Sequence, residues 1–323
     1  MNLVLQLWHR GGIESVEIYL PIADLPVNIF LVLAMGLAVG FVSGLFGIGG
    51  GFLMTPLLIF IGISPAVAVA TVSTHIAASS FSGAVTYWRR RAIDLTLALM
   101  LLAGGIVGTV SGVWLFTALR GLGQLDITIG LSYVLLLGSV GAMMVIEGLR
   151  AMLRARQGKP VELRRPGSHT WIHGLPLKFR FKQSKIYVSA IPVCVIGLIM
   201  GFIGAIMGIG GGFLLVPMLI YFLRVPTNVV IGTSMVLTLV TMASATILHA
   251  ATNHQVDAVL ALILMVGGVT GAQFGARAGQ KMRSERLRLL LGVLVLAVGS
   301  RFAFDLVVAP ADLYTVRATG DAP

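Results

Sequence analysis

The stretch Gly47-Ile48-Gly49-Gly50-Gly51-Phe52-Leu53 recurs later in the chain as Gly208-Ile209-Gly210-Gly211-Gly212-Phe213-Leu214, and each copy is followed three residues on by a proline, Pro56 or Pro217. Each copy also follows an apolar segment of roughly the twenty residues that a helix needs to cross a bilayer. Inside hydrocarbon, a run of glycines that breaks a helix leaves backbone N–H and C=O groups unpaired, which is costly. We therefore interpret the two runs as helix breaks that together line one polar site in a membrane.

The composition is typical of a polytopic membrane protein. Hydrophobic residues make up 57% of the 323 residues, only 11% are charged, and the mean hydropathy is +0.97. The formal charge of +11 comes from basic residues in loops between apolar runs, which favours the positive-inside rule over binding of nucleic acid. Cys194 is the single cysteine, and no Cys/His cluster has zinc-site spacing, so we expect no metal and no other cofactor.

The apolar and polar runs predict an all-α fold with two transmembrane repeats. Each repeat is expected to hold a helical hairpin broken by glycines, followed by three transmembrane helices. The glycines at 104, 105, 108 and 112 recur at 267, 268, 271 and 275, and we interpret them as sites of close helix packing. The predicted parts are an extracytoplasmic or interfacial segment at 1–26, repeat one at 27–153, a basic cytoplasmic loop at 154–185, repeat two at 186–308 (its first span beginning at Ile186) and a polar tail at 309–323.

The basic residues predict that the two repeats are inverted in the membrane. Three arginines, Arg89 to Arg91, lie in a loop whose counterpart at 252–255 has no Lys or Arg. The second repeat instead has five basic residues between Arg277 and Arg288, where the first has only Arg120. Opposite bias implies inverted orientation, with the basic loops on the cytoplasmic side of the membrane. Inversion requires the chain to double back at each break rather than to continue as a full span, and the sequence leaves both possibilities open.

The breaks are predicted to bind an anion. A helix that begins inside the bilayer presents free N–H groups and a partial positive charge, and glycines let the backbone approach a ligand closely. The following span in each repeat adds a stripe of hydroxyl groups on one helical face, and His75 is a titratable side chain at mid-span. The predicted substrate-binding residues are Gly47, Gly49, Gly50, Gly51, Phe52, Thr71, Thr74, His75, Gly208, Gly210, Gly211, Gly212, Phe213, Thr233 and Ser234.

Structural explanations compete with each of these assignments. The glycines could serve only to allow a tight hairpin, and the hydroxyls could pack between helices or bond to their own helix carbonyls. His75 could be a neutral side chain bonded to a neighbouring helix. We favour the substrate role for the breaks because the same motif occurs twice.

Several functional classes are excluded by the motifs. The glycine runs lack the Gly-Lys-Ser/Thr of a phosphate loop and the preceding strand of a dinucleotide site. No chain of acidic residues at mid-span suggests proton pumping, and no arginine ring suggests a voltage sensor. A secondary carrier for a small anion remains, with the lipid bilayer as its surroundings and no nucleic-acid partner. We assign no catalytic residue.

The residues resemble the sulfite exporter TauE/SafE family. The resemblance covers about 27–308 and is carried by the doubled Gly-Ile-Gly-Gly-Gly-Phe-Leu-x-x-Pro motif, the alanine-rich Thr/Ser span and Trp88-Arg89-Arg90 ahead of Asp94. It implies a bacterial inner-membrane permease that exports small sulfur oxyanions such as sulfite, or organosulfonates such as sulfoacetate. Repeat one departs from the pattern, reading Thr71-Val72-Ser73 where such proteins often have adjacent Thr-Ser, as repeat two does at Thr233-Ser234.

Two other functions compete with export. One is an intramembrane enzyme that uses His75 with a nearby serine, although no second catalytic group has a convincing spacing. The other is a non-transporting partner subunit that recruits proteins through the basic loop at 150–185. The sequence leaves the identity of the anion, the coupling ion and the oligomeric state open.

Overall fold

The computed structural model describes residues 17–46, 51–156, 177–181, 183–184, 186–222, 227–279 and 284–307. The chain forms two compact units, one of residues 1–122 with 164–281 and one of residues 123–163 with 282–323. Within the described residues, five helical stretches are long and apolar enough to cross a membrane, and two shorter apolar helices cover Ile29–Leu45 and Gly51–Phe60. This helical content agrees with the predicted polytopic membrane protein.

In the first unit, both halves of the chain contain the same series of elements. The first series is β1 (Glu17–Leu20), β2 (Leu25–Asn28), α2 (Ile29–Phe46), α3 (Gly51–Phe60), α4 (Pro65–Arg89) and α5 (Leu95–Gly121). The second is β3 (Lys178–Phe181), β4 (Ile186–Ser189), α7 (Ala190–Met207), α8 (Gly212–Tyr221), α9 (Thr227–Leu248) with the π-helix η2 (His249–Asn253), and α10 (Ala258–Gly279). From the first strand to the short helix, matching elements begin at a constant separation in the sequence: β1 and β3 at 17 and 178, α2 and α7 at 29 and 190, α3 and α8 at 51 and 212.

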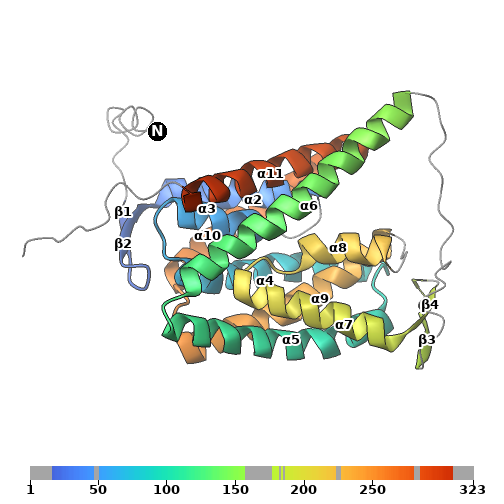
Figure 1. Cartoon of the computed structure of the whole chain (residues 1–323), viewed down its shortest axis with the longest axis horizontal. Coiled ribbons are helices and arrows are strands. Elements are labelled where there is room, and N and C mark those ends of the chain that lie inside the picture. The colour runs from blue at the N-terminus through green and yellow to red at the C-terminus, as the bar shows by residue number, and fades with distance from the viewer. Residues whose placement is uncertain are drawn as a thin grey trace, which may run out of the picture. The chain divides into compact units, whose positions relative to one another are not determined.

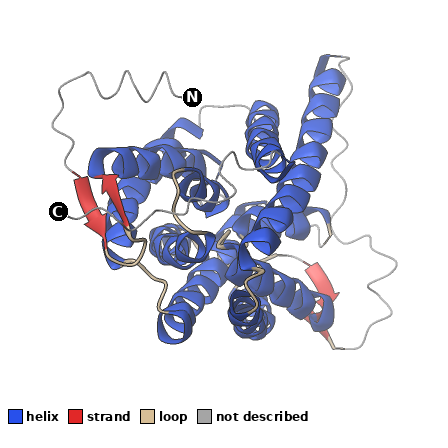
Figure 2. Cartoon of the chain, turned by 60° about the vertical axis from the view of Figure 1, so that its left-hand side comes forward, coloured by secondary structure: helices blue, strands red, loops and turns tan. Residues whose placement is uncertain are grey.

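Each series opens with an antiparallel β-hairpin that was not predicted. The strand β1 and the start of β2 fall in the expected interfacial segment at 1–26, and the strand at 178–181 falls in the expected basic loop. The first span, expected from 27, begins two residues later, because β2 extends to Asn28. The expected span from Ile186 is also wrong at its start, because 186–189 form β4 and Ser189 caps α7 by accepting a hydrogen bond from the Ile191 N–H. The two hairpins lie at opposite ends of the first unit (Figures 1 and 2).

Helices of one half pair with helices of the other half: α2 packs on α10, α5 on α7, and α4 on α9. Glycines allow the backbones of the first two pairs to touch. A Cβ atom on Gly40 would lie 2.2 Å from the Gly268 carbonyl oxygen, and one on Gly108 would lie 2.0 Å from that of Leu198. The prediction that these glycine stripes serve close helix packing is therefore confirmed.

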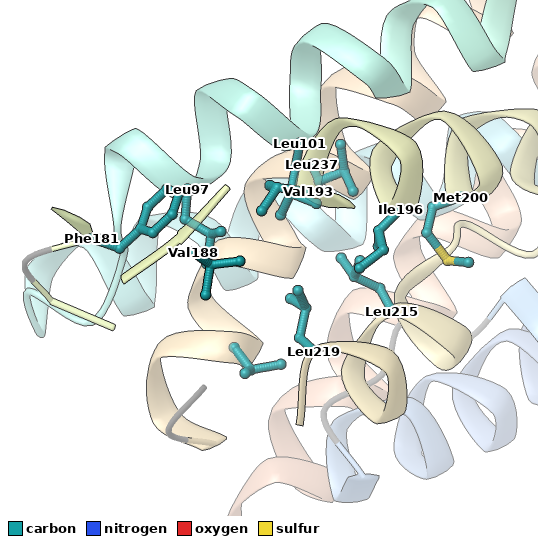
Figure 3. Packing of buried hydrophobic residues seen from close by; sticks show 11 residues of the cluster. Leu97, Leu101, Phe181, Val188, Val193, Ile196, Met200, Leu215, Leu219 and Leu237 are labelled. Atoms are coloured by element: carbon teal, nitrogen blue, oxygen red, sulfur yellow. The ribbon is translucent and has the colours of Figure 1, made fainter. Parts of the chain in front are cut away.

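A buried apolar cluster holds the short helix α8 in place. It joins side chains from α5, α7, α8, α9 and the β3–β4 hairpin (Figure 3). Leu215 and Leu219 of α8 are fully buried in it. Figure 1 shows α8 running back alongside α7, so the chain reverses direction at the second glycine break.

The second unit consists of α6 (Leu125–Arg156) packed on α11 (Ser284–Val307). The rings of Tyr133 and Phe302 stack with their centroids 5.2 Å apart and their planes 7° from parallel. Gly141 allows α11 to pack closely on α6, since a Cβ there would lie 2.9 Å from Leu296 Cγ.

Candidate functional site

The second glycine break is a buried, sharply turning segment between α7 and α8. Gly208 ends α7 in the left-handed conformation, with φ of 65°, and donates its N–H to the Gly204 carbonyl. Gly210 and Gly211 also have positive φ, 80° and 67°. Only glycine adopts these angles without strain, which explains why three glycines follow one another closely here. Gly211 is then the N-cap residue of α8, and its carbonyl accepts the Leu215 N–H at 2.8 Å.

The start of α3 lies directly against this break. Phe52 and Phe213 are both buried, and their rings stack with centroids 4.7 Å apart and planes 14° from parallel. The Thr55 hydroxyl donates to the Gly208 carbonyl at 3.2 Å. A Cβ on Gly51 would lie 2.8 Å from that same oxygen. The first turns of α3 and α8 therefore meet, whereas Gly47, Gly49 and Gly50 lie outside the described residues.

Ile76 of α4 fills the space between the two short helices. Its Cδ1 atom would lie 2.1 Å from a Cβ on Gly51, and its Cγ2 atom 2.7 Å from a Cβ on Gly210. Any side chain at either glycine must therefore displace Ile76. The same face of α4 carries Val69, which would lie 3.0 Å from a Cβ on Gly208. On α4, Gly51, Gly208 and Gly210 thus face apolar residues, whereas Gly210 also lies near Thr238 of the hydroxyl stripe predicted on α9, whose Cγ2 atom would be 3.2 Å from a Cβ there.

Two residues of that hydroxyl stripe have structural partners. The Thr71 hydroxyl accepts the backbone N–H of Asp257 at 3.0 Å, and the Thr233 hydroxyl accepts that of Asp94 at 3.2 Å. Both threonines are fully buried. The two bonds are equivalent, because each ties a helix that follows a short helix, α4 or α9, to the start of the fourth helix in the other series.

The other predicted polar residues point to different neighbours. Thr74 donates to Thr246 of α9 at 3.4 Å, and Ser234 donates to the Ile231 carbonyl within its own helix. His75 is buried and faces α10. Its ring lies over Gly268, where a Cβ would come within 1.9 Å of the His75 Cε1 atom. The His75 Nδ1 atom has no hydrogen-bond partner.

A model of the family described as sulfite exporter TauE/SafE matches residues 32–302. The chain belongs to the TauE/SafE family. A probable membrane transporter protein of Xylella fastidiosa (strain 9a5c) is 30% identical over 281 residues, which cover 84% of this chain and 93% of that protein. The probable membrane transporter proteins YjnA and YunE of Bacillus subtilis (strain 168) are 27% and 23% identical, over 83% and 86% of this chain and 97% and 98% of their own. No solved structure gives a significant match.

This TauE/SafE protein has two buried aspartates, Asp94 and Asp257, that the predicted binding residues do not include. The Asp94 carboxylate accepts three hydrogen bonds, from the Leu97 N–H at the start of α5 and from the N–H and hydroxyl of Ser184 in the β3–β4 turn. Asp257 likewise accepts the N–H groups of Val259 and Leu260 at the start of α10. An aspartate just before a predicted helix is a recognisable N-cap signal.

The second aspartate completes a symmetrical arrangement. Asp257 also accepts the N–H of Ile22, which lies in the β1–β2 turn, at 3.1 Å. Each aspartate therefore caps its own helix and binds the β-hairpin of the other half of the chain. Among the buried side chains that the structure describes, these carboxylates are the charged ones, apart from the histidines. Within the same residues, no three His, Cys, Asp or Glu side chains gather as a metal site would require.

Proposed function

We propose that this TauE/SafE protein is a secondary transporter that exports small sulfur-containing anions, such as sulfite or organosulfonates, across the bacterial inner membrane. The observation that carries the proposal is the meeting of the first turns of α3 and α8, through the Phe52–Phe213 stack and the Thr55–Gly208 bond. Family membership and relatives named as probable membrane transporters support transport as the general activity.

The chemistry of the two helix starts suits an anion. A helix start carries N–H groups without intrahelical acceptors and about half a positive charge. Two such starts, held together in an apolar surrounding, attract an oxyanion without a fixed cation that would trap it. The glycines at 47, 49 and 50 belong to the same proposed cradle, together with Gly51, Phe52, Gly208 and the residues from Gly210 to Phe213. Thr71, Thr74, Thr233 and Ser234 lie on the next helices and have structural partners in this conformation, so we assign them a supporting role in holding α4 and α9 around the cradle. The Nδ1 atom of His75, which has no partner, is the further polar group that we assign to the site.

An inverted arrangement of the two halves completes the proposal. Three features support it: the placement of the β-hairpins at opposite ends of the first unit, the reversal of the chain at the second break, and the pairing of α2 with α10 and α5 with α7. With this arrangement, the positive-inside rule assigns the basic residues Arg89 to Arg91 and those between Arg277 and Arg288 to the cytoplasmic side in our proposal. Rocking of one half against the other would then expose the cradle to each side in turn.

The membrane potential favours the proposed direction. Moving one negative charge outward across an inside-negative potential of 100 mV releases about 2.3 kcal/mol. This driving force means that export of a monoanion in our proposal needs no second energy source.

Efflux from preloaded cells tests the proposal. Labelled sulfite and a panel of sulfonates should leave cells faster when the protein is present. Gly51→Ala and Gly211→Ala should abolish the increase, because the first brings a Cβ within 2.1 Å of Ile76 and the second forces a side chain onto a φ of 67°. Gly121→Ala is the matched control, since a Cβ there meets nothing within 4 Å. Efflux equal to that of cells without the protein, for every anion tested, would refute the sulfur assignment.

A further inference from the structure

Ser80 of α4 is a buried hydroxyl group without a hydrogen-bond partner. The side chain is 1% exposed. In the described part of the chain, only Ser80 Oγ and His75 Nδ1 are buried side-chain nitrogen or oxygen atoms that lack a partner. A polar group left unpaired in this way normally destabilises a protein, so an unpaired hydroxyl indicates that something else bonds to it.

Other hydroxyl groups on α4 bond to their own helix. Ser73 donates to the Val69 carbonyl at 2.8 Å, Ser79 to that of Ile76 at 3.0 Å and Thr86 to that of Ser82 at 3.0 Å. This back-bonding is the usual way to satisfy a hydroxyl in a transmembrane helix. For Ser80, the carbonyl one turn earlier is that of Ile76, which already accepts the Ser79 hydroxyl and, by helix geometry, the Ser80 N–H.

Ser80 lies next to the proposed cradle. It follows Ile76 by four residues, so it occupies the same face of α4 about 6 Å further along the helix. Ile76 is the side chain that lies between Gly51 and Gly210. The direction from Ile76 to Ser80 leads toward Arg89, which the proposed topology places on the cytoplasmic side. An exported anion would therefore meet Ser80 before it reaches the two helix starts.

The second half of the chain has an apolar residue at the equivalent place. Thr71 of α4 and Thr233 of α9 make equivalent bonds, so they occupy equivalent positions in the two halves. Ser80 and Met242 each follow their threonine by nine residues, so Met242 is the counterpart of Ser80. Met242 is fully buried and lies against Gly204, where its Cε atom would be 2.8 Å from a Cβ. At this position, one half of the chain has a packed methionine, Met242, and the other has the short polar side chain of Ser80.

We propose that the Ser80 hydroxyl donates a hydrogen bond to an oxygen of the transported anion on the cytoplasmic side of the glycine breaks, and so helps to select oxyanions. This inference rests on the proposed function. A neutral donor at this position adds affinity for sulfite or a sulfonate without the binding strength of an arginine. Ser80 is a specificity residue that the predicted hydroxyl stripe did not include.

The test compares Ser80→Ala with Ser79→Ala and Ser80→Thr. Ser80→Ala should raise the apparent KM for efflux about ten-fold, as expected for the loss of one hydrogen bond to a charged group. Ser79→Ala should leave the KM unchanged, because that hydroxyl is satisfied by its own helix. Ser80→Thr keeps a hydroxyl and should restore most of the affinity.

Thermal unfolding of the purified variants separates a ligand contact from a structural role. Removing an unpartnered hydroxyl should leave the Tm of Ser80→Ala equal to or above that of the wild type. A lower Tm in Ser80→Ala than in Ser79→Ala would overturn the inference, and so would an unchanged KM.

The role of Ser80 can be tested separately if the sulfur assignment fails. If the wild type moves no sulfur anion, the readout becomes the rise in Tm produced by sulfite, sulfate, nitrate and phosphate, each added alone. A rise that the wild type shows and Ser80→Ala loses would uphold the role of Ser80 for another oxyanion. A rise equal in both proteins, or no rise at all, would overturn it.

Discussion

Replacing Asp94 by asparagine isolates the bond between the carboxylate and the β3–β4 turn. Asparagine is as good an N-cap as aspartate, so the bond from the Leu97 N–H to the side-chain oxygen at the start of α5 is kept. The amide nitrogen, however, replaces the oxygen that accepts the Ser184 N–H at 3.0 Å and the Ser184 hydroxyl at 2.9 Å. The hydroxyl can rotate to become an acceptor, whereas the N–H is left facing another donor.

The size of the effect follows from the bonds that are lost and the usual energies of such bonds. A hydrogen bond to a charged group contributes about 1.5–3 kcal/mol, and a buried N–H left without an acceptor costs about 1–3 kcal/mol. Because these two figures partly describe the same loss, we expect Asp94→Asn to lower the free energy of unfolding by about 2–4 kcal/mol. Ser184→Ala removes only the hydroxyl bond and should cost about half as much.

Chemical unfolding of the purified protein in detergent measures both values. Asp126→Asn is the control, because Asp126 is exposed in the first turn of α6 and should contribute less than about 1 kcal/mol through the helix dipole. In the double variant, the effects of Asp94→Asn and Ser184→Ala should be less than additive, since both remove the same contact. An Asp94→Asn protein as stable as the control would refute the reasoning.

Two further substitutions test the helix contacts. Gly268→Ala would place a Cβ 1.9 Å from His75 Cε1 and should destabilise the protein by about 1–3 kcal/mol. Adding His75→Ala should recover much of this loss. Thermal unfolding of the single and double variants measures both effects, and additive effects would contradict the contact. Thr71→Val leaves the buried N–H of Asp257 without its acceptor and should cost about 1–3 kcal/mol in the same assay, while Thr270→Val, on an exposed helix face, should cost less than 0.5 kcal/mol. Equal stability of the two valine variants would show that the cross-repeat bond is absent.

The glycine patterns in the sequence predicted much of the helix packing. A close contact between backbones needs glycine on one helix face at a spacing of about four residues, and such a spacing is visible without any structure. Gly40, Gly108 and Gly268 all lie at contacts of this kind. The glycines of the second break likewise take the positive φ angles that such a run permits.

The β-hairpins could not be found by the same reasoning. Their strands are four residues long and lie beside apolar segments, so a hydropathy pattern merges β4 with the helix that follows. A stricter alignment of the two halves would have shown that residues 17–28 and 178–189 precede α2 and α7 at the same displacement. That alignment is the signal that the sequence did contain.

The hydroxyl stripe shows where sequence reasoning about a site reaches its limit. Periodicity places Thr71, Thr74 and His75 on related faces of one helix, but it does not tell which neighbour each face meets. In the structure, Thr71 bonds to Asp257, Thr74 bonds to Thr246 of α9, and His75 packs on Gly268 of α10. These partners depend on contacts between residues more than 150 positions apart, and no local pattern encodes them.

Transport by the purified protein in liposomes tests the central claim most directly. Liposomes loaded with labelled sulfite and given an inside-negative potential should release it in a saturable manner, faster as the potential increases. Liposomes with Gly211→Ala should release it at the rate of empty liposomes, and those with Gly121→Ala at the wild-type rate. Release by the folded wild-type protein no faster than from empty liposomes, or full release with Gly211→Ala, would contradict the account that paired glycine breaks carry a small sulfur anion outward.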